Sequence, residues 1–261
     1  MKHILITNDD GYDQAGLIAL RDALIDIAKV TVVAPASEKS ACGHSLTLTK
    51  PLRIIEVQKD FYKMDDGTPT DCIFVSLDTL FKDKKPDLII SGINMGSNMG
   101  EDITYSGTAS AAMEGVLQGI PSIAISQVYN KQKGISPNWN FALAKKSIKD
   151  IVLKIFNNKF PLPNRKFLNI NIPYININES KGTKITNAGY RKYNNETHKH
   201  IDPRGKEYYW IGIHPLIWKK IDNDYICDFE AIQSNCISIS PIKVDMTSYD
   251  DISILNEWIK E

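Results

Sequence analysis

The stretch Ile4-Leu-Ile-Thr-Asn-Asp-Asp-Gly11 decides the fold. Its first half is an uninterrupted apolar run closed by Thr7, which is typical of a parallel strand buried on both faces. Its second half ends that strand with three polar residues and a glycine. Between Ala15 and Ile27, apolar residues then recur at helical spacing. A buried strand that leads directly into a helix predicts the first unit of an α/β sheet.

The same alternation of strands and helices continues through the first half of the chain. We expect further strands at 29–34, 87–91 and 122–126, and helices at 70–81 and 108–118. Such alternation predicts an α/β fold with a Rossmann-like, doubly wound, mostly parallel sheet and right-handed crossovers.

The second half has a different pattern. We expect a helix at 141–156 and a strand at 167–173, followed by several short β-segments between 182 and 245 that are separated by turn sequences at 202–205 and 222–224. A last helix is expected at 248–260, with Ser248 as its N-cap. The expected organisation is an α/β catalytic domain at 1–180, a smaller β-rich hairpin region at 181–247 and a C-terminal helix at 248–261.

Composition excludes several classes of protein. The 261 residues include 31 Lys and Arg and 31 Asp and Glu, and this zero net charge argues against a nucleic-acid polymer as partner. No run of apolar residues is long enough for a membrane span. The four scattered cysteines form no CxxC pair, which argues against a zinc site and a disulfide scaffold. Because the chain opens directly on a strand-like segment, the expected location is the cytoplasm.

Asp9 and Asp10 stand at the carboxyl end of the first strand, the edge of such sheets where ligands bind. Two adjacent carboxylates repel each other, and a divalent cation is the usual way to keep both ionised. Their hard oxygen ligands favour magnesium, manganese or calcium over zinc. An Asx turn in which Asp10 caps the next helix is an equally good interpretation of the pair alone.

The next two strand ends also carry polar groups. The loop Ala34–Ser45 after the second strand is long and contains three serines, together with Lys39 and His44. The third strand leads into a glycine-rich stretch, Ser91–Gly100, in which Asn94 and Asn98 alternate with glycines.

The helix expected near 108–118 opens with Ser106-Gly107-Thr108, and its free N–H groups suit a phosphate. The glycine spacing matches neither a Walker A motif nor GxGxxG. An acidic pair, a hydroxyl loop and a helix N-terminus at one sheet edge together indicate a metal-dependent phosphate-ester hydrolase.

Two other classes fit the acidic pair less well. A receiver-like magnesium-binding signalling module would need a phosphoacceptor aspartate at a later strand end, where this chain has Ser91-Gly-Ile-Asn94. A phosphatase that forms a covalent aspartyl-phosphate would need the spacing DxD, which Asp9-Asp10 lacks.

Several motifs resemble one known family over nearly the whole chain. They are Thr7-Asn-Asp-Asp-Gly11, Ala34-Pro35 with Lys39-Ser40, Gly67-Thr-Pro-Thr-Asp-Cys72, Ser91-Gly-Ile-Asn94, Asn98-Met-Gly100, Tyr105-Ser-Gly-Thr108, Leu168-Asn-Ile-Asn-Ile-Pro173, Asp202-Pro-Arg-Gly205, Tyr208-Tyr-Trp-Ile-Gly212 and Ser238-Ile-Ser-Pro241. On these motifs the chain closely resembles the SurE stationary-phase survival proteins, which are bacterial and archaeal 5'-nucleotidases acting on nucleoside monophosphates.

The resemblance implies a set of site residues. The ligands of one divalent cation per subunit (magnesium or manganese, with calcium as a further occupant in crystals) would be Asp9, Asp10, Ser40 and Asn94. The phosphate contacts would be Asn98, Ser106, Gly107 and Thr108. The substrate loop would comprise Lys39, Gly43, His44, Gly67, Thr68 and Asp71. Lys39 replaces the arginine usual in the family before the metal-binding serine, which exchanges a bidentate phosphate partner for a point charge.

The expected mechanism is direct hydrolysis, and the expected assembly follows from the resemblance. A metal-activated water would attack the phosphorus, and Asp9 or Asp10, with His44 as an outside candidate, would accept its proton. Nucleoside 3'-monophosphates and short polyphosphates stay open as further substrates. The family forms homodimers or homotetramers in which the β-rich second half exchanges elements between subunits, so this region is expected to serve in oligomerisation.

Overall fold

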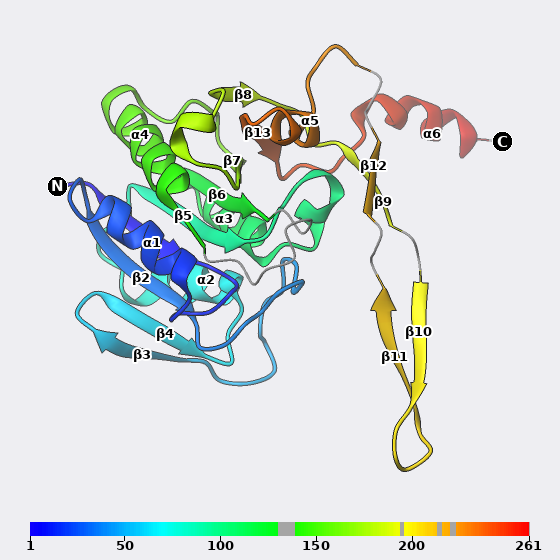
Figure 1. Cartoon of the computed structure of the whole chain (residues 1–261), viewed down its shortest axis with the longest axis horizontal. Helices are drawn as coiled ribbons and strands as arrows, with labels where there is room; N and C mark the ends of the chain where they lie inside the picture. Colours follow the sequence, from blue (N-terminus) through cyan, green and yellow to red (C-terminus); the bar gives the residue numbers. More distant parts are fainter. Residues whose placement is uncertain (130–138, 194–195, 213–215, 220–222, 261) are drawn as a thin grey trace.

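The computed structural model describes residues 1–129, 139–193, 196–212, 216–219 and 223–260. The main sheet contains β1 (His3–Thr7), β2 (Lys29–Pro35), β3 (Arg53–Gln58), β4 (Phe61–Asp65), β5 (Leu88–Met95), β6 (Ser122–Val128), β7 (Lys166–Pro173), β8 (Thr183–Ile185) and β13 (Ile237–Lys243). Their order is β3-β4-β2-β1-β5-β6-β7-β13-β8 (Figure 1). The strands from β4 to β7 in this order run parallel, which confirms the doubly wound α/β fold.

Helices cover both faces of this sheet (Figure 1). On one face, α1 (Ala15–Leu24) and α4 (Ala142–Asn158) pack against a core that includes Ile4 and Ile6 of β1. On the other face, α2 (Pro69–Thr79) and α3 (Gly107–Leu117) pack over Leu5. β1 is therefore buried on both faces, as its apolar run predicts.

Two features of the first half differ from expectation. The β3–β4 hairpin joins the edge of the sheet, although no strand was expected there. β5 continues past Ser91 to Met95, because a bulge against β6 between Ser91 and Asn94 lets the strand resume. Asn94 thus belongs to the end of a strand and not to the loop that follows it.

The segment 181–247 contributes to both the sheet and an arm. β13 pairs with β7 and β8 in the main sheet, so the sheet draws strands from beyond residue 180. The arm consists of two ribbons that project from the body (Figure 1): β9 (Tyr190–Tyr193) with β12 (Leu216–Lys219), and β10 (Glu196–Ile201) with β11 (Glu207–Gly212). Gly205 N–H donates to the Asp202 carbonyl at 3.0 Å, which confirms the turn at 202–205, whereas Asp222 of the second turn lies outside the described residues.

Two short helices complete the second half. α5 (Asp228–Gln233) follows the arm and was not expected. α6 (Ile252–Trp258) is preceded by the 3₁₀ turn η4 (Tyr249–Asp251). Ser248 stands at the N-cap of η4, but its hydroxyl donates to the Asp251 carboxylate and caps no backbone N–H, contrary to expectation. Serine hydroxyls hydrogen-bond local groups within reach, and here that group is the Asp251 carboxylate three residues along the chain.

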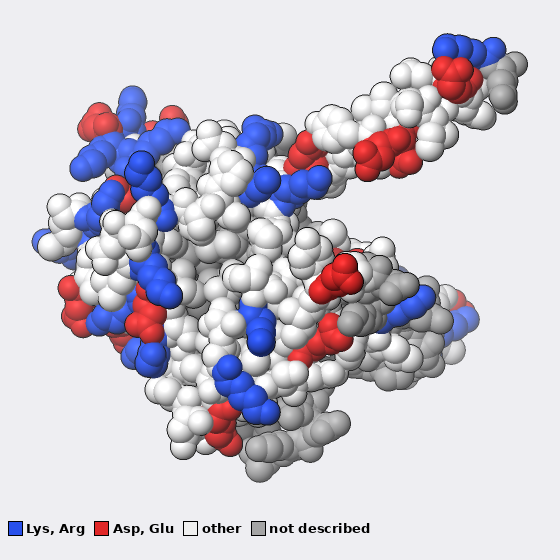
Figure 2. Space-filling view, turned by 90° about the horizontal axis from the view of Figure 1, so that it is seen from above, with Lys and Arg blue, Asp and Glu red and all other residues white. Residues whose placement is uncertain are grey.

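The distribution of surface charge and the state of the cysteines match what the composition predicts. On the face in Figure 2, the described acidic and basic side chains are interspersed. All four cysteines are free thiols. None of the described helices has the length and apolar character that crossing a membrane requires.

Candidate active site

The candidate site lies where the strand order reverses. β1 pairs with β2 on one side and with β5 on the other, and the chain proceeds outward from this centre in both directions. In open α/β sheets the carboxyl ends at such a switch point form a crevice. Asp9 and Asp10 follow β1, Asn94 lies at the end of β5, and Ser40 lies in the loop after β2. The fold thus places at one edge of the sheet the four residues that the resemblance implies as metal ligands.

Asp9 and Asp10 are fixed by different neighbours. Asp9 is only 4% exposed, and its Oδ1 accepts a hydrogen bond from the buried Thr108 hydroxyl at the start of α3. Asp10 Oδ2 accepts the Met95 N–H of β5 at 3.2 Å. The acidic pair therefore joins the end of β1 to the start of α3 and the end of β5.

The electrostatics of this pair favour a cation. Burial, more than any other effect, raises the pKa of Asp9. Burial and then the charge of Asp9 raise the pKa of Asp10 to about 7. Among the residues that the structure describes, no lysine, arginine or histidine forms an ion pair with either carboxylate. Two confined carboxylates without a cationic side chain form a donor set that fits a hard divalent cation.

The loop after β2 brings a further carboxylate that the sequence interpretation overlooked. The Ser40 hydroxyl donates to Glu38 Oε1 at 2.7 Å, and the Lys39 N–H donates to the Asp9 carbonyl at 2.7 Å. The charge of Glu38 also raises the pKa of both Asp9 and Asp10. The only signal for Glu38 in the sequence is its place two residues before Ser40 in a polar loop.

Asn94 is oriented by its own turn. Its Nδ2 donates to the Gly96 carbonyl at 3.2 Å, which leaves the amide oxygen as the group that could face a cation. An amide oxygen is a suitable ligand for magnesium or manganese.

The start of α3 lies directly against Asp9. Ser106 is the N-cap, and its Oγ accepts the Ala109 N–H at 3.0 Å. A Cβ added at Gly107 would lie 2.8 Å from the Asp9 Cβ, so only a glycine allows the helix this close. The N–H groups at a helix N-terminus attract anions, and here the Asp9 carboxylate lies beside them. A bound cation would offset the charge of this carboxylate and leave the helix N-terminus able to attract a phosphate.

Asn98 is placed differently from the other phosphate candidates. Its Nδ2 donates to Ser126 Oγ at 2.8 Å, and its backbone groups bond the side chains of Asn169 and Asn171. The side chain is thus engaged in a buried polar network that ties the glycine-rich stretch to β6 and β7.

The first part of the expected substrate loop packs along α3. The Gly43 N–H donates to the Tyr105 carbonyl at 3.0 Å, and His44 Nε2 lies 2.9 Å from Glu114 Oε2. Burial alone would raise the pKa of Glu114, but the hydrogen bonds from His44 and Gln118 hold it below its usual range. Glu114 was also overlooked, since a lone glutamate on a helix carries no sequence signal.

The remaining residues of the expected substrate loop, Gly67, Thr68 and Asp71, lie at the start of α2. Asp71 accepts hydrogen bonds from the Thr68 N–H and from both the N–H and hydroxyl of Thr47, while Thr68 caps the helix. A Cβ at Gly67 would lie 2.3 Å from Met64 Sδ. These groups fix the loop in place at the start of α2.

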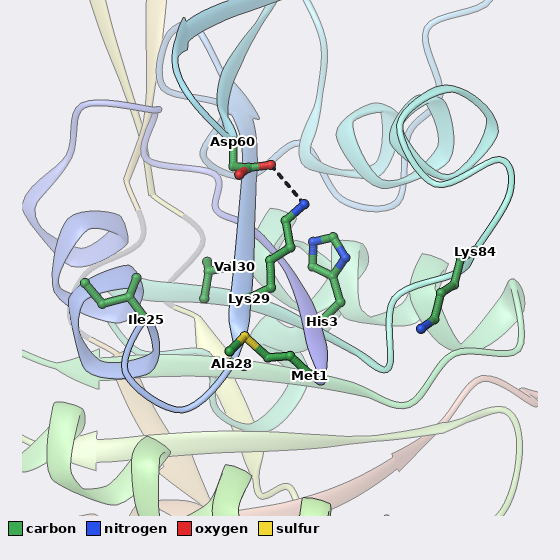
Figure 3. A pocket seen from close by; sticks show the side chains of 8 residues that line it. All are labelled: Met1, His3, Ile25, Ala28, Lys29, Val30, Asp60 and Lys84. Atoms are coloured by element: carbon green, nitrogen blue, oxygen red, sulfur yellow. Dashed lines mark ion pairs between the residues drawn. The ribbon is translucent and has the colours of Figure 1, made fainter.

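A hollow of about 470 Å³ lies at the opposite edge of the sheet, at the amino ends of β1 and β2 (Figure 3). It is lined by Met1, His3, Ile25, Ala28, Lys29, Val30, Asp60 and Lys84. Lys29 and Asp60 pair across it at 3.4 Å, as the dashed line in Figure 3 shows. It contains none of the candidate site residues.

The fold and the site together define a class: a doubly wound α/β protein with an acidic pair and a helix N-terminus at its switch point. Residues 4–195 match the family model described as Survival protein SurE, and the chain belongs to the SurE family. It is 66% identical over 261 residues to the 5'-nucleotidase SurE of Aliarcobacter butzleri, covering 99% of each chain. It is 60% identical over 264 residues to the 5'-nucleotidase SurE of Helicobacter hepaticus, covering 100% of each.

A solved structure shows the same architecture. The crystal structure of the SurE protein from Aquifex aeolicus superposes with a TM-score of 0.82 at 40% sequence identity. The match covers 99% of this chain and 100% of the other. The family resemblance noted in the sequence motifs is thereby confirmed.

Proposed function

We propose that this protein is a metal-dependent 5'-nucleotidase that hydrolyses nucleoside 5'-monophosphates to nucleoside and phosphate. The names of its relatives in Aliarcobacter butzleri and Helicobacter hepaticus support the nucleotidase activity. One observation of this chain carries the proposal: the start of α3 lies against Asp9, and neither Asp9 nor its neighbour Asp10 has a cationic partner among the described residues.

The cation would be held by Asp9, Asp10, Ser40 and Asn94. A bound divalent cation lowers the pKa of a ligated water and offsets charge on the phosphoryl oxygens. We place the phosphate at the start of α3, at Ser106, Gly107 and Thr108, with Asn98 as a further contact, where the helix dipole stabilises negative charge. The Thr108 hydroxyl orients the Asp9 carboxylate. Either Asp9 or Asp10 would accept the proton of the attacking water.

The arm and the last helix support a homo-oligomer. Large apolar side chains are exposed on both, including Trp210 at 63% and Trp258 at 68%. Exposed apolar surface of this extent is typical of a subunit interface. We therefore propose a homodimer or homotetramer, and a sedimentation equilibrium mass equal to one 29.4 kDa chain would contradict it.

The activity is tested by phosphate release from a panel of nucleoside 5'- and 3'-monophosphates and a short polyphosphate. We expect release from the 5'-monophosphates with magnesium or manganese, and loss of release with a chelator that adding back either cation restores. Saturable manganese binding without release from any substrate would contradict the proposal and favour the receiver-like signalling module.

The raised pKa of Asp10 predicts a pH-dependent effect of the cation on stability. In the metal-free protein the folded pKa of about 7 lies above the ordinary value of 3.8, so the folded state binds protons more tightly than the unfolded state. Between about pH 4 and 7 this group therefore makes metal-free folding less favourable as the pH rises. Manganese, which needs the ionised pair, should raise the melting temperature more at pH 8 than at pH 5.

Thermal unfolding with and without manganese at both pH values measures this difference. Asp10→Asn should abolish most of the manganese effect at pH 8. An equal rise in melting temperature at pH 5 and pH 8 in the wild-type protein would contradict the assignment.

A further inference from the structure

Asp228, the first residue of α5, joins three separate backbone segments. It is completely buried, and its carboxylate accepts the N–H groups of Gly100 at 2.7 Å, Gly189 at 3.1 Å and Phe229 at 2.9 Å. Gly100 begins the 3₁₀ turn η1 (Gly100–Thr104), which leads into the start of α3. Gly189 directly precedes β9 at the base of the arm. One carboxylate thus holds the approach to the phosphate site against the base of the arm.

The two segments also touch each other backbone to backbone. Gly100 has φ +56°, and a Cβ there would lie 2.5 Å from the Gly189 carbonyl oxygen. A Cβ at Gly189 would lie 2.9 Å from the ring of Phe229. No side chain fits between them, so Asp228 acts where η1 and the base of the arm approach most closely.

Arg191 of β9 adds a second attachment to η1. Its N–H donates to Glu101 Oε2 at 2.9 Å, and its guanidinium forms an ion pair with Asp102. The Asp102 carbonyl in turn accepts the Ser106 N–H at 3.1 Å. A continuous chain of contacts therefore runs from the base of the arm through η1 to the N-cap of α3.

We propose that Asp228 is a positioning residue that sets where the N-terminus of α3 presents its N–H groups to the substrate phosphate. This inference rests on the proposed phosphate site at Ser106–Thr108. The Asp9 carboxylate bonds Thr108 and the Asp10 carboxylate bonds Met95. Among the described residues, neither carboxylate hydrogen-bonds Asp228 or Arg191. Loss of the Asp228 carboxylate should weaken phosphate binding more than it weakens cation binding.

The test is Asp228→Asn in the full-length protein, because the amide is isosteric but cannot accept all three N–H groups as a carboxylate does. We expect KM for a nucleoside 5'-monophosphate and Ki for inorganic phosphate to rise together by about tenfold, because small displacements of a binding group have effects of this size. The manganese concentration for half-maximal activity should change less than about twofold. Arg191→Met, which removes the ion pair with Asp102, should shift Ki in the same direction.

Asp202→Asn is the matched control. Asp202 also lies in the arm, and its Oδ1 accepts the N–H groups of Arg204 at 2.8 Å and Lys206 at 2.9 Å, but at the tip far along the chain from η1. It should leave KM and Ki unchanged. Circular dichroism establishes that each variant is folded.

The proposal is overturned if Ki for phosphate in folded Asp228→Asn and Arg191→Met stays within about twofold of the wild-type value, or if the manganese requirement shifts as much as Ki. Calorimetric titration with inorganic phosphate and manganese tests the same difference without turnover. If the wild-type protein hydrolyses no nucleotide, the proposed function fails, and this titration still decides the role of Asp228.

Discussion

We expect Asp9→Asn to lower phosphate release from nucleoside 5'-monophosphates at least about a thousandfold, equivalent to about 4 kcal/mol of transition-state stabilisation. The substitution removes one of the two negative charges that would hold the cation. The carboxylate that is lost also contacts Thr108 at the start of α3. The fold should be retained, because the amide oxygen can still accept the Thr108 hydroxyl and the repulsion with Asp10 is relieved. Turnover at saturating manganese and the melting temperature measure the two effects separately.

Asp60→Asn is the control for this variant. Asp60 lies in the turn between β3 and β4 and pairs with Lys29 at the opposite edge of the sheet (Figure 3). Its loss removes an exposed ion pair of small energetic value, so turnover should stay within about twofold. An Asp9→Asn protein that keeps more than about a tenth of the wild-type turnover would contradict the catalytic role of the pair.

Gly107→Ala should lower turnover by about 10- to 100-fold, because the methyl group displaces reacting groups from their alignment. The added Cβ would lie 2.8 Å from the Asp9 Cβ and 3.0 Å from both Asp9 Oδ2 and Cys42 Sγ. Either Asp9 or the start of α3 must move, and each belongs to the site. Steady-state kinetics with magnesium measures the loss.

Gly115→Ala separates the loss of alignment from a loss of stability. Gly115 lies on the same helix, and its added Cβ would lie 2.2 Å from Ser122 Oγ, on the side that packs against β6. This variant should melt at a lower temperature but keep the wild-type turnover per folded molecule. Equal losses of turnover in the two variants would show that Gly107 matters only for folding.

The parts of the fold that the sequence predicts are those dictated by local pattern. Successive side chains of a strand point to opposite faces, so Ile4 and Ile6 enter one core and Leu5 enters the other. All three are apolar because helices cover both faces of the sheet. The same pattern predicts the edge of the sheet at which the site lies, because the carboxyl ends of parallel strands all lie at one edge.

The other parts depend on contacts between residues distant in sequence. The polar face of β13 gives no sign that it pairs with β7 across a separation of about seventy residues, as Ser240 opposite Asn169 illustrates. The amide of Asn98 bonds Ser126 on β6, and that bond exists only once the sheet has formed. Glu38 affects the pKa values of Asp9 and Asp10 only because the fold brings its loop close to them.

The polar residues of the loops also have competing roles that sequence cannot distinguish. Asp71 resembles a ligand group in sequence, yet its carboxylate holds Thr47 and Thr68 at the start of α2. Thr108 was expected to contact phosphate, and the structure adds a bond from its hydroxyl to Asp9. Such assignments depend on where a side chain points, which no spacing rule specifies.

The most direct test of the account is the anomalous diffraction of crystals of this protein soaked in manganese. The account predicts one manganese ion per subunit, bounded by the carboxylates of Asp9 and Asp10, the hydroxyl of Ser40 and the amide oxygen of Asn94. An anomalous peak elsewhere, or four side chains that point away from one another in a manganese-saturated crystal, would contradict it.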